Sequence, residues 1–181
     1  MVFTLFHAGF VIPLRLKFRR LSLPALLAGA MLPDLEIPFI WLLTHGATDR
    51  MVLHSLFGAL VIGVPLTLLF VYLALPKFRA LLPEKVLGMH TAPFTVPPSS
   101  FLPASLSSLI GICSHVLVDS FNYHAYNASP LLWPFSQRTF IFPLFGNGQF
   151  SAIFWLLLAA TLTLLSFRAL NRDARRSPIS R

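Results

Sequence analysis

Residues 54–75 read HSLFGALVIGVPLTLLFVYLAL and decide the fold. This stretch contains no Asp, Glu, Lys or Arg, and about 20 such apolar residues form a helix long enough to cross a bilayer. The whole chain agrees with this reading, because 56% of its residues are hydrophobic and only 11% are charged. Soluble domains carry about 25% charged residues. The sequence therefore predicts a helical membrane protein.

Three further windows have nearly the same apolar character, although Pro33 and Asp34 interrupt the first of them and the second is the most polar. They cover residues 22–45, 102–122 and 151–170. Residues 1–14 are apolar but too short to span, so we expect them to lie in the interface or to re-enter the bilayer. We therefore predict an all-α polytopic membrane helix bundle of about four spanning helices plus a short N-terminal interfacial or re-entrant segment.

Basic residues predict the orientation. The net charge of +8 would suggest a nucleic-acid partner in a soluble protein, but in a membrane protein Lys and Arg collect in cytoplasmic loops. If residues 15–20, 76–101 and the C-terminal end from Arg168 onward share one side, that side holds all 14 Lys and Arg residues except Arg50 and Arg138. We therefore expect both termini in the cytoplasm, membrane lipid as a partner and no nucleic acid.

The predicted organisation is a single integral membrane domain over residues 1–172, followed by a basic cytoplasmic tail over residues 173–181. Residues 83–103 are rich in Pro and Ser and are interpreted as a cytoplasmic linker. Residues 123–150 are rich in Pro and aromatic side chains. Because Trp and Tyr settle at the membrane interface, we expect this loop to form a lid at the outer surface.

A histidine and a carboxylate lie four residues apart in the third window, in the run SHVLVDSF. This spacing places His115 and Asp119 on one face of a helix, where both can reach the same cation. The same geometry also allows an ordinary His–Asp hydrogen bond. The apolar surroundings strengthen the interpretation of this pair as a functional site, because an unsatisfied polar group is costly there.

Two acids interrupt the first window. An ionised Asp34 near the middle of a span costs on the order of 3 kcal/mol, so it needs a cation, a proton or a metal. In the alternative reading, Pro33 breaks the helix and Asp34 caps the half-helix that follows. Glu36 comes two residues later and points away from Asp34 on a helix, so we expect it to snorkel or to reach a cavity.

Two further histidines, His54 and His7, are candidate ligands from other parts of the chain. His54 opens the second window and His7 lies in the apolar N-terminal segment, and either could be an ordinary interfacial residue. His45 and His90 are interpreted as solvated, whereas His124 could join a site from the outer loop. Imidazole and carboxylate ligands without a cysteine cluster suit a divalent metal, most of all zinc. The predicted metal ligands are His7, Asp34, His54, His115 and Asp119.

Four stretches of the chain together resemble a bacterial membrane family, the domain of unknown function 4184. They are FTLFHAGFVIPLRL, LSLPALLAGAMLPDLE, HSLFGALVIGVPL and LIGICSHVLVDSF, in this order along the chain. The resemblance implies a location in the bacterial plasma membrane. That family is in turn similar to predicted membrane-bound metal-dependent hydrolases and, more distantly, to the zinc-dependent phospholipase C and P1 nuclease group.

The wider resemblance implies a ligand set. Asp34, His54, His115 and Asp119 match the ligands of one metal, and His7 matches an N-terminal histidine. The second His-x-x-x-acid pair of the soluble enzymes has no counterpart here, so the resemblance implies one metal or at most two.

The leading hypothesis is a membrane-embedded metal-dependent hydrolase acting on a phosphoester, with a lipid-like substrate. Glu36 or Asp119 is the expected catalytic base. Two alternatives stay open: a structural or assembly membrane protein with polar helix contacts, and an ion- or proton-handling protein. The sequence leaves the oligomeric state undecided.

Overall fold

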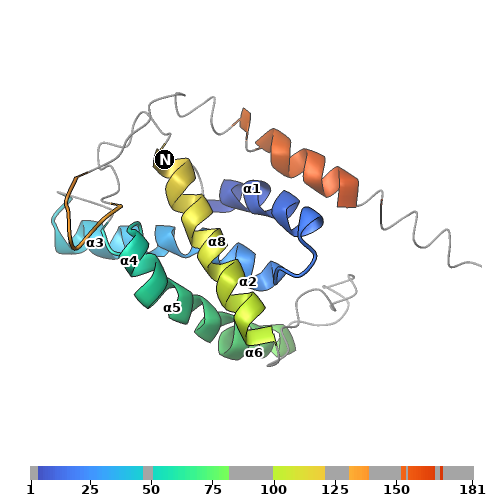
Figure 1. Ribbon diagram of the computed structural model, residues 1–181, viewed down its shortest axis with the longest axis horizontal. Helices are drawn as coiled ribbons and strands as arrows, with labels where there is room; N and C mark the ends of the chain where they lie inside the picture. The colour runs from blue at the N-terminus through green and yellow to red at the C-terminus, as the bar shows by residue number, and fades with distance from the viewer. Residues whose placement is uncertain are drawn as a thin grey trace, which may run out of the picture.

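The structure is a computed structural model that describes residues 4–46, 51–81, 100–120, 131–138, 152–153, 155–165 and 168. Helices are the regular elements of this part of the chain, which contains no strand, and Figure 1 shows their arrangement. The predicted all-α class is therefore confirmed for the described residues. The predicted tail, residues 83–99 of the linker and most of the outer loop, with His90 and His124, lie outside them.

The first apolar window forms a helical run over Leu23–Leu43 that is long enough to cross a membrane. Its central turn is a 3₁₀ helix that begins at Pro33, where the predicted interruption falls. Proline has no N–H to continue an α-helical ladder, and a 3₁₀ turn is a common way to join two helical segments. The three parts are α2 (Leu23–Met31), η1 (Pro33–Glu36) and α3 (Ile37–Leu43).

The second window forms the run Leu56–Phe78, which is also long enough to span. Ser55 caps its start by accepting a hydrogen bond from the Gly58 N–H at 2.9 Å. A π-helical turn precedes each of its two prolines, Pro65 and Pro76, and widens the helix where the ring would clash. The parts are α4 (Leu56–Gly58), η2 (Ala59–Gly63), α5 (Val64–Leu69), η3 (Phe70–Ala74) and α6 (Leu75–Leu81).

The third spanning candidate is α8 (Phe101–Ser120), which packs closely against α2. Two glycines permit this approach. A Cβ atom on Gly29 would lie 2.5 Å from the Ser108 carbonyl oxygen, and one on Gly111 would overlap the Leu26 carbonyl oxygen. Small residues of this kind let membrane helices come close enough for backbone contact. The close approach brings the C-terminal half of α8 beside the end of α2.

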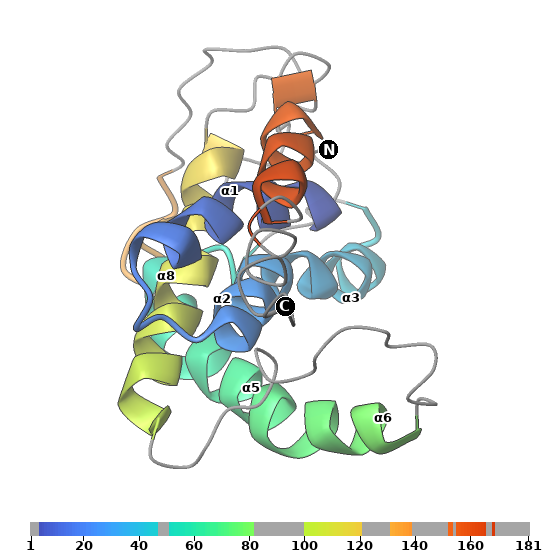
Figure 2. The ribbon, with the colours of Figure 1, turned by 90° about the vertical axis from the view of Figure 1, so that its right-hand side faces the viewer.

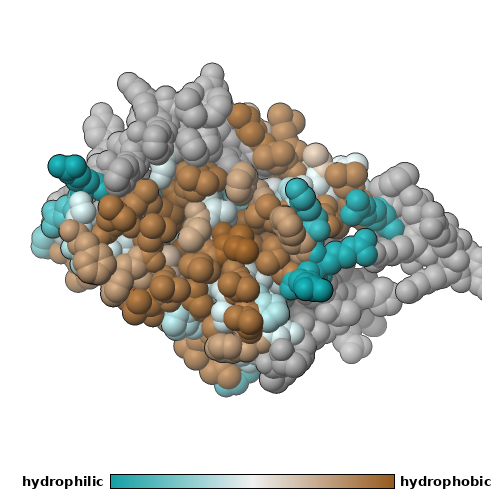
Figure 3. All heavy atoms as spheres, in the orientation of Figure 1, coloured by the Kyte–Doolittle hydropathy of each residue, from teal (hydrophilic) through white to brown (hydrophobic). Residues whose placement is uncertain are grey.

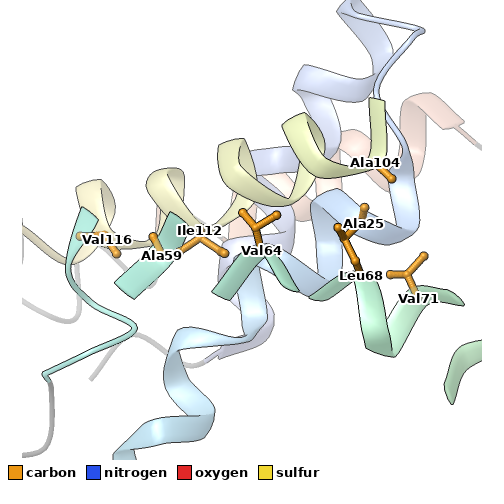
Figure 4. Close-up of a cluster of buried hydrophobic side chains, with 8 residues drawn as sticks. All are labelled: Ala25, Ala59, Val64, Leu68, Val71, Ala104, Ile112 and Val116. Carbon is orange, nitrogen blue, oxygen red and sulfur yellow. The ribbon is translucent and has the colours of Figure 1, made fainter. Parts of the chain in front are cut away.

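The apolar core lies where α2, α8 and the second helical run meet (Figure 4). Its buried side chains are Ala25, Ala59, Val64, Leu68, Val71, Ala104, Ile112 and Val116. The outside is apolar as well: the face in Figure 3 is mostly hydrophobic, with hydrophilic side chains toward its left and right ends. Apolar patches of this extent are rare on monomeric soluble proteins, so this surface is typical of a protein in lipid.

The described residues therefore include three helices long and apolar enough to span a membrane. From the fourth predicted window, the structure describes a shorter apolar helix over Trp155–Leu165. The number of four spans stays a prediction.

The N-terminal segment forms α1 (Thr4–Lys17), which packs against both α2 and α8 (Figure 2). At 14 residues, or about 21 Å, it is too short to cross the hydrocarbon core. Val11 of α1 is fully buried in a small cluster with Leu26 and Ala30 of α2. This packing places the preceding turn of α1, which carries His7, beside α8.

Candidate metal centre

Four predicted ligands come together in the structure: Asp34, His54, His115 and Asp119. One ligand atom from each lies within 4.8 Å of the others. They come from three segments of the chain, namely η1, the turn before α4, and α8. The cluster could hold a metal ion, as the sequence predicted for these residues.

The four side chains are nearly removed from solvent. The side chains of His54 and His115 are 0% exposed and that of Asp119 is 1% exposed, whereas that of Asp34 is 12% exposed. Asp34 is therefore the member through which the cluster is most accessible. Buried carboxylates and imidazoles in such a setting are expected to be paired or to coordinate a metal.

The Nδ1 atoms of both histidines are held by neighbouring acceptors. His115 Nδ1 lies 2.7 Å from the carbonyl oxygen of Ala30, and His54 Nδ1 lies 2.7 Å from Glu36 Oε1. A carbonyl or carboxylate oxygen only accepts, so each Nδ1 carries the hydrogen. In a neutral ring the Nε2 atom then carries the lone pair with which histidine binds a metal.

The Nε2 atoms face the two aspartates at distances too long for hydrogen bonds. His115 Nε2 lies 3.4 Å from Asp34 Oδ1 and 3.6 Å from Asp119 Oδ2, and His54 Nε2 lies 3.7 Å from Asp119 Oδ2. Hydrogen bonds between such atoms span about 2.7–3.2 Å. Ligands at about 2.0–2.2 Å from a tetrahedral zinc lie about 3.3–3.6 Å from one another. These three distances are close to the spacing of ligands around a shared ion, and all four ligand atoms lie within 4.8 Å of one another.

His7 lies at the edge of this cluster and is not one of the four converging ligands. Its ring stacks on the ring of His115, with centroids 3.8 Å apart, and its Nε2 lies 3.8 Å from Asp119 Oδ1. Asp119 thus presents Oδ2 to the four-residue cluster and Oδ1 to His7. Burial lowers the pKa of His7 to about 3. The packing of α1 against α2 and α8 therefore brings His7 beside the cluster.

Glu36 lies beside the cluster, in contact with His54 but outside the converging set. Its side chain is buried rather than snorkelling, and it accepts hydrogen bonds from the backbone N–H groups of Met51 and Leu53 and from the His54 ring. The sequence spacing correctly separated Glu36 from Asp34, but it contained no signal for the contact with His54. His45, interpreted as solvated, is exposed.

The fold and the site together define a helical protein of membrane type with a buried His–Asp cluster that could hold a metal ion. The chain matches the family model described as Domain of unknown function (DUF4184) over residues 1–176, and it belongs to that family. No curated protein and no solved structure matches the chain.

Proposed function

We propose that this protein is a membrane-embedded metal-dependent hydrolase that acts on a phosphoester, with zinc as the metal. The spacing of the buried ligand atoms supports this proposal most directly. Three distances of 3.4–3.7 Å between histidine nitrogens and aspartate oxygens suit zinc coordination and exceed hydrogen-bond lengths, and all four ligand atoms lie within 4.8 Å of one another. A bound divalent ion would supply an activated water and would stabilise charge on a phosphoryl oxygen.

Residues of the chain orient the ligands and accept the proton. His54 and His115 orient their Nε2 atoms toward the common centre because Glu36 and Ala30 hold their Nδ1 atoms. We assign the role of proton acceptor to Asp119, whose two oxygens face different sides of the cluster. The burial of these groups excludes bulk water and strengthens their electrostatic interactions.

A lipid or lipid-linked molecule is the proposed substrate. Asp34 is the most accessible of the four ligands, and its neighbour Leu35 is 61% exposed. Phe39, one helical turn beyond, is 68% exposed. A phosphoester that reaches Asp34 across this surface therefore meets apolar side chains, which suit an acyl or polyprenyl group. The proposed setting is the bacterial plasma membrane with both termini in the cytoplasm.

A structural role is the second candidate, and a specific observation favours it. Four protein ligands fill a tetrahedral site, whereas catalytic zinc sites keep a position open for water. In this reading the ion ties η1, the start of the second run and α8 together, and the protein hydrolyses nothing.

The first experiment measures the metal content of detergent-purified protein after incubation with zinc. We expect about one zinc per chain, retained by the exposed control His45→Ala and lost by His54→Ala and Asp119→Ala. Protein that carries zinc is then offered phosphodiester substrates, both water-soluble and in lipid vesicles. Wild-type protein without zinc would overturn the metal site, whereas zinc-loaded protein without hydrolysis would favour the structural candidate.

A further inference from the structure

The carboxylate of Glu36 is a buried anion that receives three hydrogen bonds. Oε1 accepts from the Met51 N–H at 3.0 Å and from His54 Nδ1 at 2.7 Å, and Oε2 accepts from the Leu53 N–H at 2.7 Å. Only 8% of the residue is exposed. The donors belong to one short segment of the chain, which lies just before the second helical run.

This segment has no helix of its own to fix the direction of the His54 side chain. Residues 51–55 form bends and turns, and α4 begins only at Leu56. Glu36, by contrast, belongs to η1 within the first spanning run. Its three hydrogen bonds therefore tie the backbone around His54 and the imidazole ring itself to the helix that also carries Asp34.

The contact also sets which ring nitrogen of His54 carries the hydrogen. A carboxylate accepts and does not donate, so Nδ1 is protonated and Nε2 is left to face Asp119 Oδ2 at 3.7 Å. Ala30 does the same for His115 through its carbonyl oxygen. Outer-shell acceptors of this kind commonly orient metal-binding histidines and raise their basicity.

We propose that Glu36 is a positioning residue that acts through His54 and not a catalytic base. A base would have to accept a proton from water, but the oxygens of Glu36 are already directed at the His54 ring and at two backbone N–H groups. This inference rests on the proposed metal site. Glu36 is the group that orients His54 toward that site. The first consequence of this inference, the hydrogen on Nδ1 of His54, is measurable without any metal.

The direct test is ¹⁵N NMR of histidine-labelled, metal-free protein in detergent micelles, with the His54 signals assigned by their loss in His54→Ala. Wild-type His54 is expected to carry its hydrogen on Nδ1. In Glu36→Gln, the single amide oxygen cannot accept all three hydrogen bonds, so the Nε2–H form of His54 should become populated. Wild-type His54 with its hydrogen on Nε2, or a tautomer that Glu36→Gln leaves unchanged, would overturn the proposal.

Zinc affinity provides the second readout, measured by competition with a chelator. We expect Glu36→Gln to weaken zinc binding by about 10- to 100-fold. The matched control is Ser55→Ala, which removes the helix cap next to His54 and leaves the ring contact intact. An equal loss of affinity in Ser55→Ala would show that Glu36 only stabilises the segment, which overturns the positioning role. A wild type that binds no zinc but has the expected tautomer refutes the proposed function, not the Glu36–His54 contact.

Discussion

His115 of α8 donates a hydrogen bond from Nδ1 to the carbonyl oxygen of Ala30 in α2, with the two atoms 2.7 Å apart. Ala30 lies in the last turn of α2, just before the helix changes to a 3₁₀ turn at Pro33. The bond therefore connects the ring to the place where the first span breaks. This break puts Asp34 within 3.4 Å of His115 Nε2.

Zinc should stabilise the wild-type protein through this arrangement. Because the ligands come from separate segments, only the folded chain presents the complete site, and binding adds to the free energy of unfolding. At free zinc 100-fold above the Kd, the gain is about 2.7 kcal/mol. Thermal melts in detergent with zinc and with a chelator measure this gain. A gain of the same size in His115→Ala would contradict the assignment of His115 as a ligand.

The approach of α2 to α8 should not tolerate a side chain at Gly111. The added methyl group of Gly111→Ala would overlap the Leu26 carbonyl oxygen. Because that oxygen belongs to the backbone, only a movement of the backbone can relieve the overlap. We expect a loss of about 1–3 kcal/mol in the free energy of unfolding. Unfolding in mixed micelles measures it. The control Leu106→Ala changes a half-exposed residue of the same helix and should cost less; equal costs would argue against the close contact between the two helices.

His7 should support the site without being required for the first metal ion. Since its Nε2 lies outside the four converging ligands, His7→Ala should retain about one zinc per chain. Its ring stacks on His115, so the variant should bind zinc less tightly than the wild type. Metal analysis and chelator competition give the two values. Complete loss of zinc, as expected for His54→Ala, would instead make His7 a ligand of that ion.

The charge distribution predicts which side of the membrane each loop occupies. The chain has one cysteine, Cys113, so its replacement by serine gives a background for single reporter cysteines. In intact bacterial cells, a membrane-impermeant thiol reagent should label Arg138→Cys and not Arg19→Cys. Both native residues are exposed in the structure. Labelling of Arg19→Cys alone would show that the orientation is the opposite of the predicted one.

Sequence alone predicted the helical class of the fold and included the four residues of the cluster among its five candidate ligands, the fifth being His7. Runs of about 20 apolar residues predict spanning helices because unpaired backbone groups are too costly in lipid. Three of the predicted windows form helices long and apolar enough to span a membrane. Asp34, His115 and Asp119 stand out for the related reason that ionisable groups are rare in such runs. The i, i+4 spacing of His115 and Asp119 follows from the helix period alone.

Tertiary structure decided which of these residues meet and in which role. The sequence placed Asp34 at mid-membrane and His54 toward one surface. It predicted that Glu36 points away from Asp34, snorkels or reaches a cavity, and is a candidate catalytic base. In the fold, Glu36 reaches across to the segment before α4 and aims His54 at Asp119. Such contacts depend on the packing of α2 against α8 and on the 3₁₀ turn at Pro33. Helix periodicity describes neighbours within one helix, whereas the approach of two helices depends on side chains from both.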